Sequence, residues 1–164
     1  MPFEIPPNLH PALHKFAWLL GTWEGGGDGD YPTIEPFAFG QQVIFQQDGR
    51  PFMHYMATSW IVDAEGNKVR DAAQETGFLR CQEDGSVEWL LTHNTGFLTL
   101  WHGQVDGAKL EVATDAVVRT ETAKEVASGH RLYGLVEGDL WFAFDMAAMG
   151  QELQPHLWGK LLRR

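Results

Sequence analysis

Residues 87–93 read Val-Glu-Trp-Leu-Leu-Thr-His and are followed by Asn-Thr-Gly at 94–96. Large side chains alternate with the polar ones at 88 and 92, which is the period of a β-strand with one buried face. The buried face carries Val87, Trp89, Leu91 and His93. Asn-x-Gly is typical of a tight turn. The stretch therefore predicts a half-buried strand that ends in a turn, with His93 pointing inward.

Similar strand-like segments continue along the chain past Gly21. Segments of about ten residues rich in Phe, Trp, Val, Thr and Tyr are separated by turn signals, which fall at 48–49, 63–67, 84–85, 94–96, 106–107 and 137–138. No long helical pattern lies between them, so neighbouring segments are expected to pair antiparallel. Such a meander forms either a sandwich or a closed barrel, and closure leaves no exposed edge strand. We therefore predict an all-β fold, an antiparallel up-and-down β-barrel of about ten strands.

Two further patterns add detail to this fold. Residues 9–20 carry apolar side chains at helical spacing and predict a short N-terminal helix that ends at Gly21. Residues 110–118 alternate, and the prediction places on one face Leu110, Val112, Thr114, Ala116 and Val118.

The glycine-rich stretch 21–29 is expected to be a first strand that another chain segment or a ligand approaches closely. Its acidic residues Asp28 and Asp30 would oppose a bound anion. Trp23 is expected to pack into one end of the core.

Charge excludes several classes of partner. The chain has 164 residues, with 12 Lys and Arg against 22 Asp and Glu, a net charge of −10. Such a protein repels a phosphate backbone or an anionic membrane surface, so neither nucleic acid nor membrane is expected as a partner. The sequence shows no signal-peptide pattern and no run of about 18 apolar residues. We expect one domain over residues 1–164, located in the cytoplasm.

Few residues suggest chemistry by their spacing. The single cysteine, Cys81, cannot form an internal disulfide or supply the paired thiolates of a zinc site. No Ser/His/Asp arrangement and no phosphate-binding glycine motif can be recognised, so no side chain is predicted to be catalytic. A site made of one histidine stays open, because haem iron needs only one protein ligand.

Two of the seven histidines are candidates for such a site. His93 shares the apolar face of its strand, although a hydrogen-bonded core histidine would do the same. His156 lies in a final strand or turn over residues 154–162, where alternation groups it with Trp158 and Lys160 on a mixed face. Periodicity alone therefore does not decide whether His156 points inward.

The ordered motifs of the chain resemble those of the nitrobindins, a family of ten-stranded β-barrel haem proteins. The resemblance begins with the motif of Gly21, Trp23, Gly25 and Gly27 and continues through Tyr31-Pro32-Thr33-Ile34, 49–52, 75–80, 118–126, 146–151 and 153–157. It covers the chain from about residue 10 onward.

The resemblance implies a function and a site. Family members bind one haem b per chain, bind nitric oxide at ferric iron and isomerise peroxynitrite to nitrate. It implies that His156 is the iron ligand and that Thr33 contacts the haem from the other side. Further cavity-lining residues are expected to be Ile34, His93, Met146 and Lys124. The ligands would be small molecules, peroxynitrite and nitric oxide. The sequence leaves the oligomeric state open between a monomer and a dimer.

A second class of function uses the same barrel. Lipocalins and fatty-acid-binding proteins carry an apolar ligand in a closed meander without catalysis. Such a carrier has no use for an imidazole in its cavity wall. A substitution of His156 therefore separates the two hypotheses.

Overall fold

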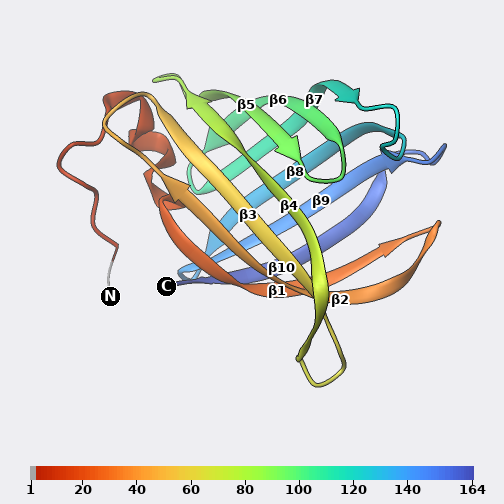
Figure 1. The fold of residues 1–164 in the computed structure, drawn as a ribbon. Helices are drawn as coiled ribbons and strands as arrows, with labels where there is room; N and C mark the ends of the chain where they lie inside the picture. The colour runs from red at the N-terminus through yellow and green to blue at the C-terminus, as the bar shows by residue number, and fades with distance from the viewer. Residues whose placement is uncertain (1–2) are drawn as a thin grey trace.

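Ten antiparallel strands close into a barrel in the computed structural model, which describes residues 3–164 (Figure 1). The strands are β1 (Gly21–Tyr31), β2 (Ile34–Gln46), β3 (Phe52–Val62), β4 (Lys68–Cys81), β5 (Ser86–His93), β6 (Phe97–Asp106), β7 (Lys109–Arg119), β8 (Val126–Val136), β9 (Asp139–Ala148) and β10 (Gln154–Arg163). Each strand pairs with its neighbours in sequence, and β1 also pairs with β10. The predicted up-and-down barrel is confirmed.

A short 3₁₀ helix, η1 (Pro11–Leu19), covers one end of the barrel (Figure 1). His10 caps it, because its Nδ1 accepts a hydrogen bond from the backbone N–H of Ala12 at 3.1 Å. Leu13 and Phe16 are fully buried, so the helix plugs this end with apolar side chains. The predicted short helix is confirmed, and no helix in residues 3–164 covers the opposite end of the barrel.

The first and last strands close the barrel through the glycine motif. Trp23 is fully buried and its indole N–H donates to the carbonyl of Leu19 at 2.9 Å, which ties β1 to the helix. Gly25 and Gly27 face the backbone of β10 so closely that a Cβ at either position would overlap a carbonyl oxygen of that strand. The predicted close approach is confirmed, and the neighbour is β10.

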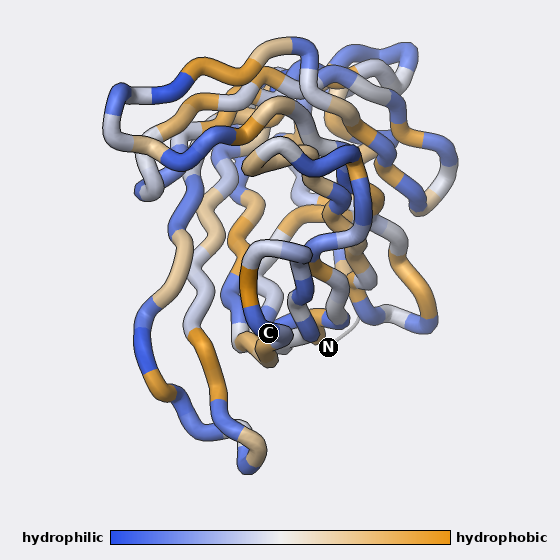
Figure 2. Tube along the Cα trace, turned by 90° about the vertical axis from the view of Figure 1, so that its right-hand side faces the viewer, coloured by the Kyte–Doolittle hydropathy of each residue, from blue (hydrophilic) through white to orange (hydrophobic). Residues whose placement is uncertain are grey.

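Buried and more exposed residues alternate along strands such as β5 and the first part of β7, and hydrophobic and hydrophilic segments lie close together along the trace (Figure 2). The half of the barrel next to η1 is filled by large buried residues, among them Trp23, Phe45, Met53, Trp89 and Leu140. The β3–β4 hairpin extends beyond the body of the barrel. No helix in residues 3–164 is long and apolar enough to cross a membrane.

A β-bulge in β7 contradicts one prediction. Trp101 pairs with Thr114, whereas Leu100 pairs with Ala116, so Asp115 is an extra residue in β7. The extra residue reverses the alternation beyond it. Val118 is 60% exposed, and the prediction that Ala116 and Val118 share the inward face of Leu110 was wrong.

Candidate functional site

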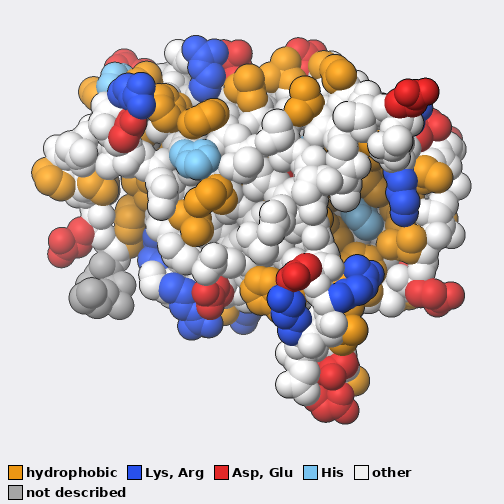
Figure 3. Space-filling model, in the orientation of Figure 1, with side chains coloured by type: hydrophobic (Ala, Val, Ile, Leu, Met, Phe, Trp, Pro, Cys, Tyr) orange, Lys and Arg blue, Asp and Glu red, His pale blue; other side chains and the backbone are white. Residues whose placement is uncertain are grey.

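A cavity of about 630 Å³ fills the half of the barrel away from η1. In the space-filling view it opens as a hollow on the right, with hydrophobic and histidine side chains inside (Figure 3). Its wall includes all six residues that the sequence predicted for the site, which are Thr33, Ile34, His93, Lys124, Met146 and His156. The fold therefore brings together candidates that lie more than a hundred positions apart in the chain.

A β-bulge in β10 turns His156 into the cavity. In β10, Pro155 pairs with Asp145 and Leu157 with Phe144, which leaves His156 as the extra residue. A bulge re-aims a side chain that strict alternation would place on the other face. His156 accordingly lines the cavity, whereas Trp158 and Lys160, with which alternation grouped it, are exposed.

The orientation of the His156 ring is fixed by backbone and aromatic contacts. Its Nδ1 lies 3.1 Å from the carbonyl oxygen of Asp30, so Nδ1 carries the proton and donates. Edge-to-face contacts with Tyr31, Phe37 and Phe144 hold the ring at centroid distances of 5.3, 6.3 and 5.9 Å. Nε2 is thereby left as the nitrogen with a free lone pair.

Burial keeps this imidazole neutral. The low-polarity surroundings lower the pKa of His156 below its ordinary value, and the hydrogen bond to the Asp30 carbonyl offsets this only in part. A neutral imidazole whose other nitrogen donates to a carbonyl has the form that ligates a metal. His156 therefore has both the protonation state and the orientation of an iron ligand.

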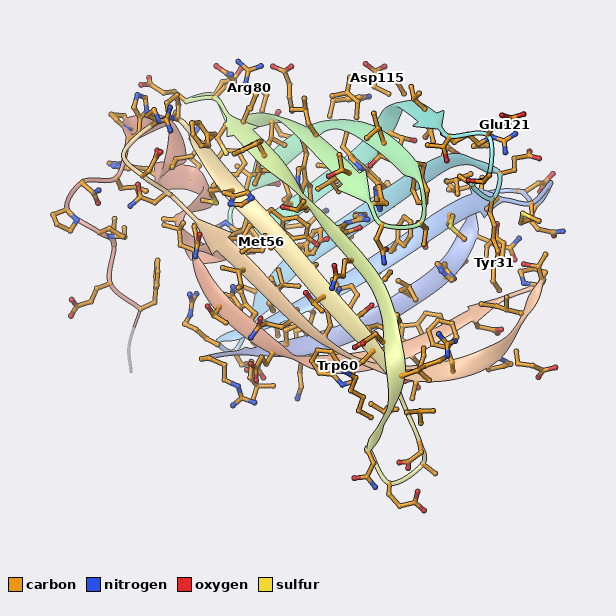
Figure 4. The ribbon with its side chains drawn as sticks, in the orientation of Figure 1. Tyr31, Met56, Trp60, Arg80, Asp115 and Glu121 are labelled. Atoms are coloured by element: carbon orange, nitrogen blue, oxygen red, sulfur yellow. The ribbon has the colours of Figure 1, made fainter. Side chains whose placement is uncertain are left out.

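Tyr31 holds the end of β1 against β9. Its hydroxyl donates to the carbonyl of Met146 at 3.0 Å and accepts from the backbone N–H of Ala148 at 2.9 Å. Tyr31 lies at the same end of the barrel as Glu121, away from Arg80 (Figure 4). This bridge fixes the segment whose Asp30 carbonyl orients His156.

The other predicted residues surround the open end of the cavity. Thr33 lies in the turn between β1 and β2, and Ile34, which is 42% exposed, begins β2. Met146 is half-buried on β9, and Lys124 is exposed in the loop between β7 and β8. Thr33 and Ile34 thus contribute to the rim of the cavity, and Lys124 contributes a positive charge.

A buried ion pair lies deeper in the cavity wall. Arg131 of β8 is 5% exposed and donates to both carboxylate oxygens of Glu75 on β4, at 2.6 and 2.9 Å. The hydroxyl of Tyr55 donates to the same carboxylate at 2.7 Å. Burial alone raises the pKa of Glu75, but the charge and hydrogen bonds of Arg131 and the contact with His93 outweigh it and hold the pKa well below its ordinary value.

His93 joins this ion pair to the cavity. The prediction from alternation that it points inward is confirmed, since it lines the cavity and its side chain is 8% exposed. Its Nδ1 lies 3.2 Å from Oε2 of Glu75 and its Nε2 lies 2.9 Å from Oγ1 of Thr99. The ring also stacks on Phe97 with centroids 4.1 Å apart.

Glu75 and Arg131 were not predicted as site residues, although the sequence contains one signal for Arg131. Gly129, Arg131 and Tyr133 alternate on β8, so strand periodicity places the Arg131 guanidinium beside an aromatic on the inward face. A charged residue at an inward position requires a partner. The identity of that partner, 56 positions earlier in the chain, could not be read from the pattern.

The site as a whole fits a haem group. Its wall near His156 is aromatic and apolar, with Phe37, Phe39, Phe142 and Phe144 among the lining residues. No group of three metal-ligating side chains occurs in the described part of the chain, so a bare metal ion has no donor set there. A single oriented imidazole in an apolar cavity suits a porphyrin, which supplies the other four iron ligands itself.

Comparison with known proteins identifies the family. The model of the THAP4-like, haem-binding β-barrel domain matches residues 12–163. A protein of a Nocardioides species named peroxynitrite isomerase is 65% identical over the full length of both chains. A ferric nitrobindin-like protein of Cutibacterium acnes is 42% identical, over 99% of each chain.

A solved structure has the same fold. The crystal structure of Rv2717c from M. tuberculosis superposes with a TM-score of 0.85 at 37% identity, over 95% of this chain and 99% of that one. The resemblance to the nitrobindins predicted from sequence motifs is confirmed, as is haem as the cofactor of the family. The chain belongs to the family of THAP4-like, haem-binding β-barrel domains.

Proposed function

We propose that this protein is a haem b-dependent peroxynitrite isomerase that also binds nitric oxide at ferric iron, with His156 as the protein ligand of the iron. The observation that carries the proposal is the bulge in β10 that turns His156 into the cavity, together with the hydrogen bond from its Nδ1 to the Asp30 carbonyl. The names of the relatives, peroxynitrite isomerase and ferric nitrobindin-like protein, support the same activity.

The chain contributes binding, orientation and the exclusion of water. Bound haem b supplies a ferric centre at which nitric oxide and peroxynitrite react. His156 would hold the iron through Nε2, while Tyr31 and the Asp30 carbonyl keep the ring in place. Thr33 and Ile34, on the rim, would contact the haem face opposite His156. The apolar wall confines reacting fragments, which favours their recombination over escape.

Lys124 is proposed to meet a haem propionate. It lies exposed at the edge of the cavity in the loop between β7 and β8. A carboxylate of the haem would reach water at this edge, where an exposed ion pair contributes about 0.2–1 kcal/mol. Lys124 would therefore orient the porphyrin more than it tightens its binding.

The alternative, a carrier of fatty acids or other apolar ligands, is disfavoured by the charge of the inner wall. Arg131, the buried cation, is already neutralised by Glu75. A fatty-acid carboxylate placed there would meet the Glu75 carboxylate without a free cation to compensate it. The inner wall therefore offers an anionic ligand no net attraction.

Titration with hemin tests the assignment of His156. The wild type is expected to bind one hemin per chain and to shift the Soret absorption band, and His156→Ala is expected to lose the spectrum of an imidazole ligand. His102→Ala is a matched control, because His102 is exposed on the outside of β6. A His156→Ala spectrum identical to that of the wild type contradicts the assignment.

Stopped-flow measurement of peroxynitrite decay tests the reaction itself. The haem-loaded wild type is expected to accelerate the decay and to raise the fraction that becomes nitrate. Apo-protein and His156→Ala serve as controls at the same protein concentration. If the haem-loaded wild type yields no more nitrate than buffer, the protein is a haem-binding barrel without isomerase activity.

A further inference from the structure

We propose that Thr99, His93 and Glu75 form a proton relay in the cavity wall, which accepts the proton of peroxynitrous acid when that acid becomes nitrate. This inference rests on the proposed isomerase function and names the residues that would handle its proton. It goes beyond the ligation of haem, because none of these side chains is needed to hold the iron.

The inner end of the relay is the Glu75 carboxylate, whose hydrogen-bonding capacity is filled. Oε1 of Glu75 accepts from Arg131 at 2.6 Å and from the Tyr55 hydroxyl at 2.7 Å. Oε2 accepts from Arg131 at 2.9 Å and lies 3.2 Å from Nδ1 of His93. A carboxylate that receives this many donors is ionised and accepts only. The proton between Glu75 and His93 therefore resides on Nδ1 of the imidazole.

This assignment fixes the direction of the remaining hydrogen bonds. With the proton on Nδ1, Nε2 of a neutral His93 is an acceptor, so the Thr99 hydroxyl donates to it at 2.9 Å. The indole N–H of Trp101 donates in turn to Oγ1 of Thr99 at 2.7 Å. The donors thus run in one direction, from Trp101 through Thr99 and His93 to Glu75.

The outer member of the relay reaches the cavity. Thr99 and His93 both line the cavity that contains His156. Oγ1 of Thr99 has a second lone pair, and no donor within residues 3–164 occupies it. An acid in the cavity can give its proton to Oγ1 while the hydroxyl proton of Thr99 passes to Nε2 of His93.

The reaction leaves one proton to be placed. Peroxynitrous acid contains the same atoms as nitrate plus a proton: its O–O bond breaks, a new N–O bond forms, and no electrons are gained or lost overall. The proton leaves the acid for Oγ1, and the Thr99 proton moves to His93. Nitrate and an imidazolium then balance each other's charge in the cavity, until the proton is lost to water.

Among the groups that face His93, only the Glu75 carboxylate stabilises a charged imidazole. The carboxylate of Glu75 on β4 contacts the ring directly, and Arg131 on β8 neutralises that carboxylate from its other side. Tyr55 on β3 and Tyr133 on β8 stay uncharged, because burial raises the pKa of both phenols. Phe97 and Trp101 on β6 carry no charge. Glu75 is thus a positioning residue that fixes the tautomer and stabilises the imidazolium.

Nitrogen NMR of the apo-protein tests the tautomer without haem. With ¹⁵N-labelled histidine, the signals of His93 are identified by their loss in His93→Gln. In the neutral imidazole we expect a protonated Nδ1 and an unprotonated Nε2, and Glu75→Gln is expected to change this pattern. A proton on Nε2 instead of Nδ1 refutes the relay.

The pH profile of the haem-loaded protein tests the transfer. His93→Gln keeps a side chain that hydrogen-bonds but cannot take up a proton, and Thr99→Val keeps the size of threonine without its hydroxyl. At mildly alkaline pH, where the peroxynitrite anion predominates, each variant is expected to isomerise at the rate of the wild type. At mildly acidic pH its isomerisation rate is expected to be lower than that of the wild type by a factor of about ten or more. His102→Gln is the control on the outer surface.

The outcomes separate this inference from the proposed function. The Soret spectrum of an imidazole ligand is expected to persist in His93→Gln and Thr99→Val, since neither residue holds the iron. If the wild type forms nitrate and the three pH profiles coincide, the relay is refuted and the isomerase stands. If the wild type forms no nitrate above buffer, both proposals fail.

Discussion

Replacing Arg131 by methionine removes the cation that keeps Glu75 ionised inside the barrel. Arg131 is 5% exposed, and its guanidinium donates two hydrogen bonds to Glu75 and lies 4.7 and 4.8 Å from the rings of Trp101 and Phe144. Removing one member of a buried ion pair costs about 3–5 kcal/mol. The loss of two hydrogen bonds to a charged group, at about 1.5–3 kcal/mol each, gives a cost of similar size. Arg131→Met is therefore expected to lower the free energy of unfolding by about 3–5 kcal/mol at neutral pH.

A double-mutant cycle separates the pair from the packing around it. Glu75→Gln alone leaves the Arg131 charge buried without its anion, so it is also expected to be costly. The double variant has neither charge, and its loss should be smaller than the sum of the single losses by about 2 kcal/mol. Urea unfolding, followed by tryptophan fluorescence and circular dichroism, measures all four proteins. Losses that add within about 0.5 kcal/mol would refute a direct energetic link between the two residues.

The same pair makes stability depend on pH. The pKa of Glu75 is lower in the folded than in the unfolded protein, so its contribution is present at neutral pH and is lost as the pH falls below about 5. Arg131 stays charged throughout this range. The wild type should therefore lose more stability than Glu75→Gln on acidification, and equal losses would contradict the assignment.

Three further predictions concern the barrel itself. Gly27→Ala is expected to destabilise or prevent folding, because a Cβ there overlaps the Trp158 carbonyl, and circular dichroism and thermal unfolding measure this. Val118→Thr should change the unfolding free energy by less than about 0.5 kcal/mol, whereas Val112→Thr should cost about 1–3 kcal/mol, because only Val112 is buried. Equal costs would contradict the β7 bulge. Cys81, whose pKa burial raises to about 12, is expected to react with a thiol reagent only after unfolding.

The sequence predicted the features that depend on short-range pattern. Alternation in residues 87–93 and regularly spaced turn residues indicated the antiparallel meander, and they placed His93 in the interior correctly. The motif around Trp23 indicated both the strand that β10 approaches and the family. These properties follow from the local period of the chain and from turn chemistry, which each segment carries by itself.

Only the tertiary structure decided which way His156 points and what Glu75 pairs with. His156 would share a face with the exposed Trp158 if β10 were regular, and the bulge that reverses it lies in the pairing of β10 with β9. Glu75 and Arg131 meet because barrel closure brings β4 and β8 to opposite sides of one cavity. A bulge and a cross-barrel ion pair are set by partners distant in sequence, so a pattern of period two does not contain them.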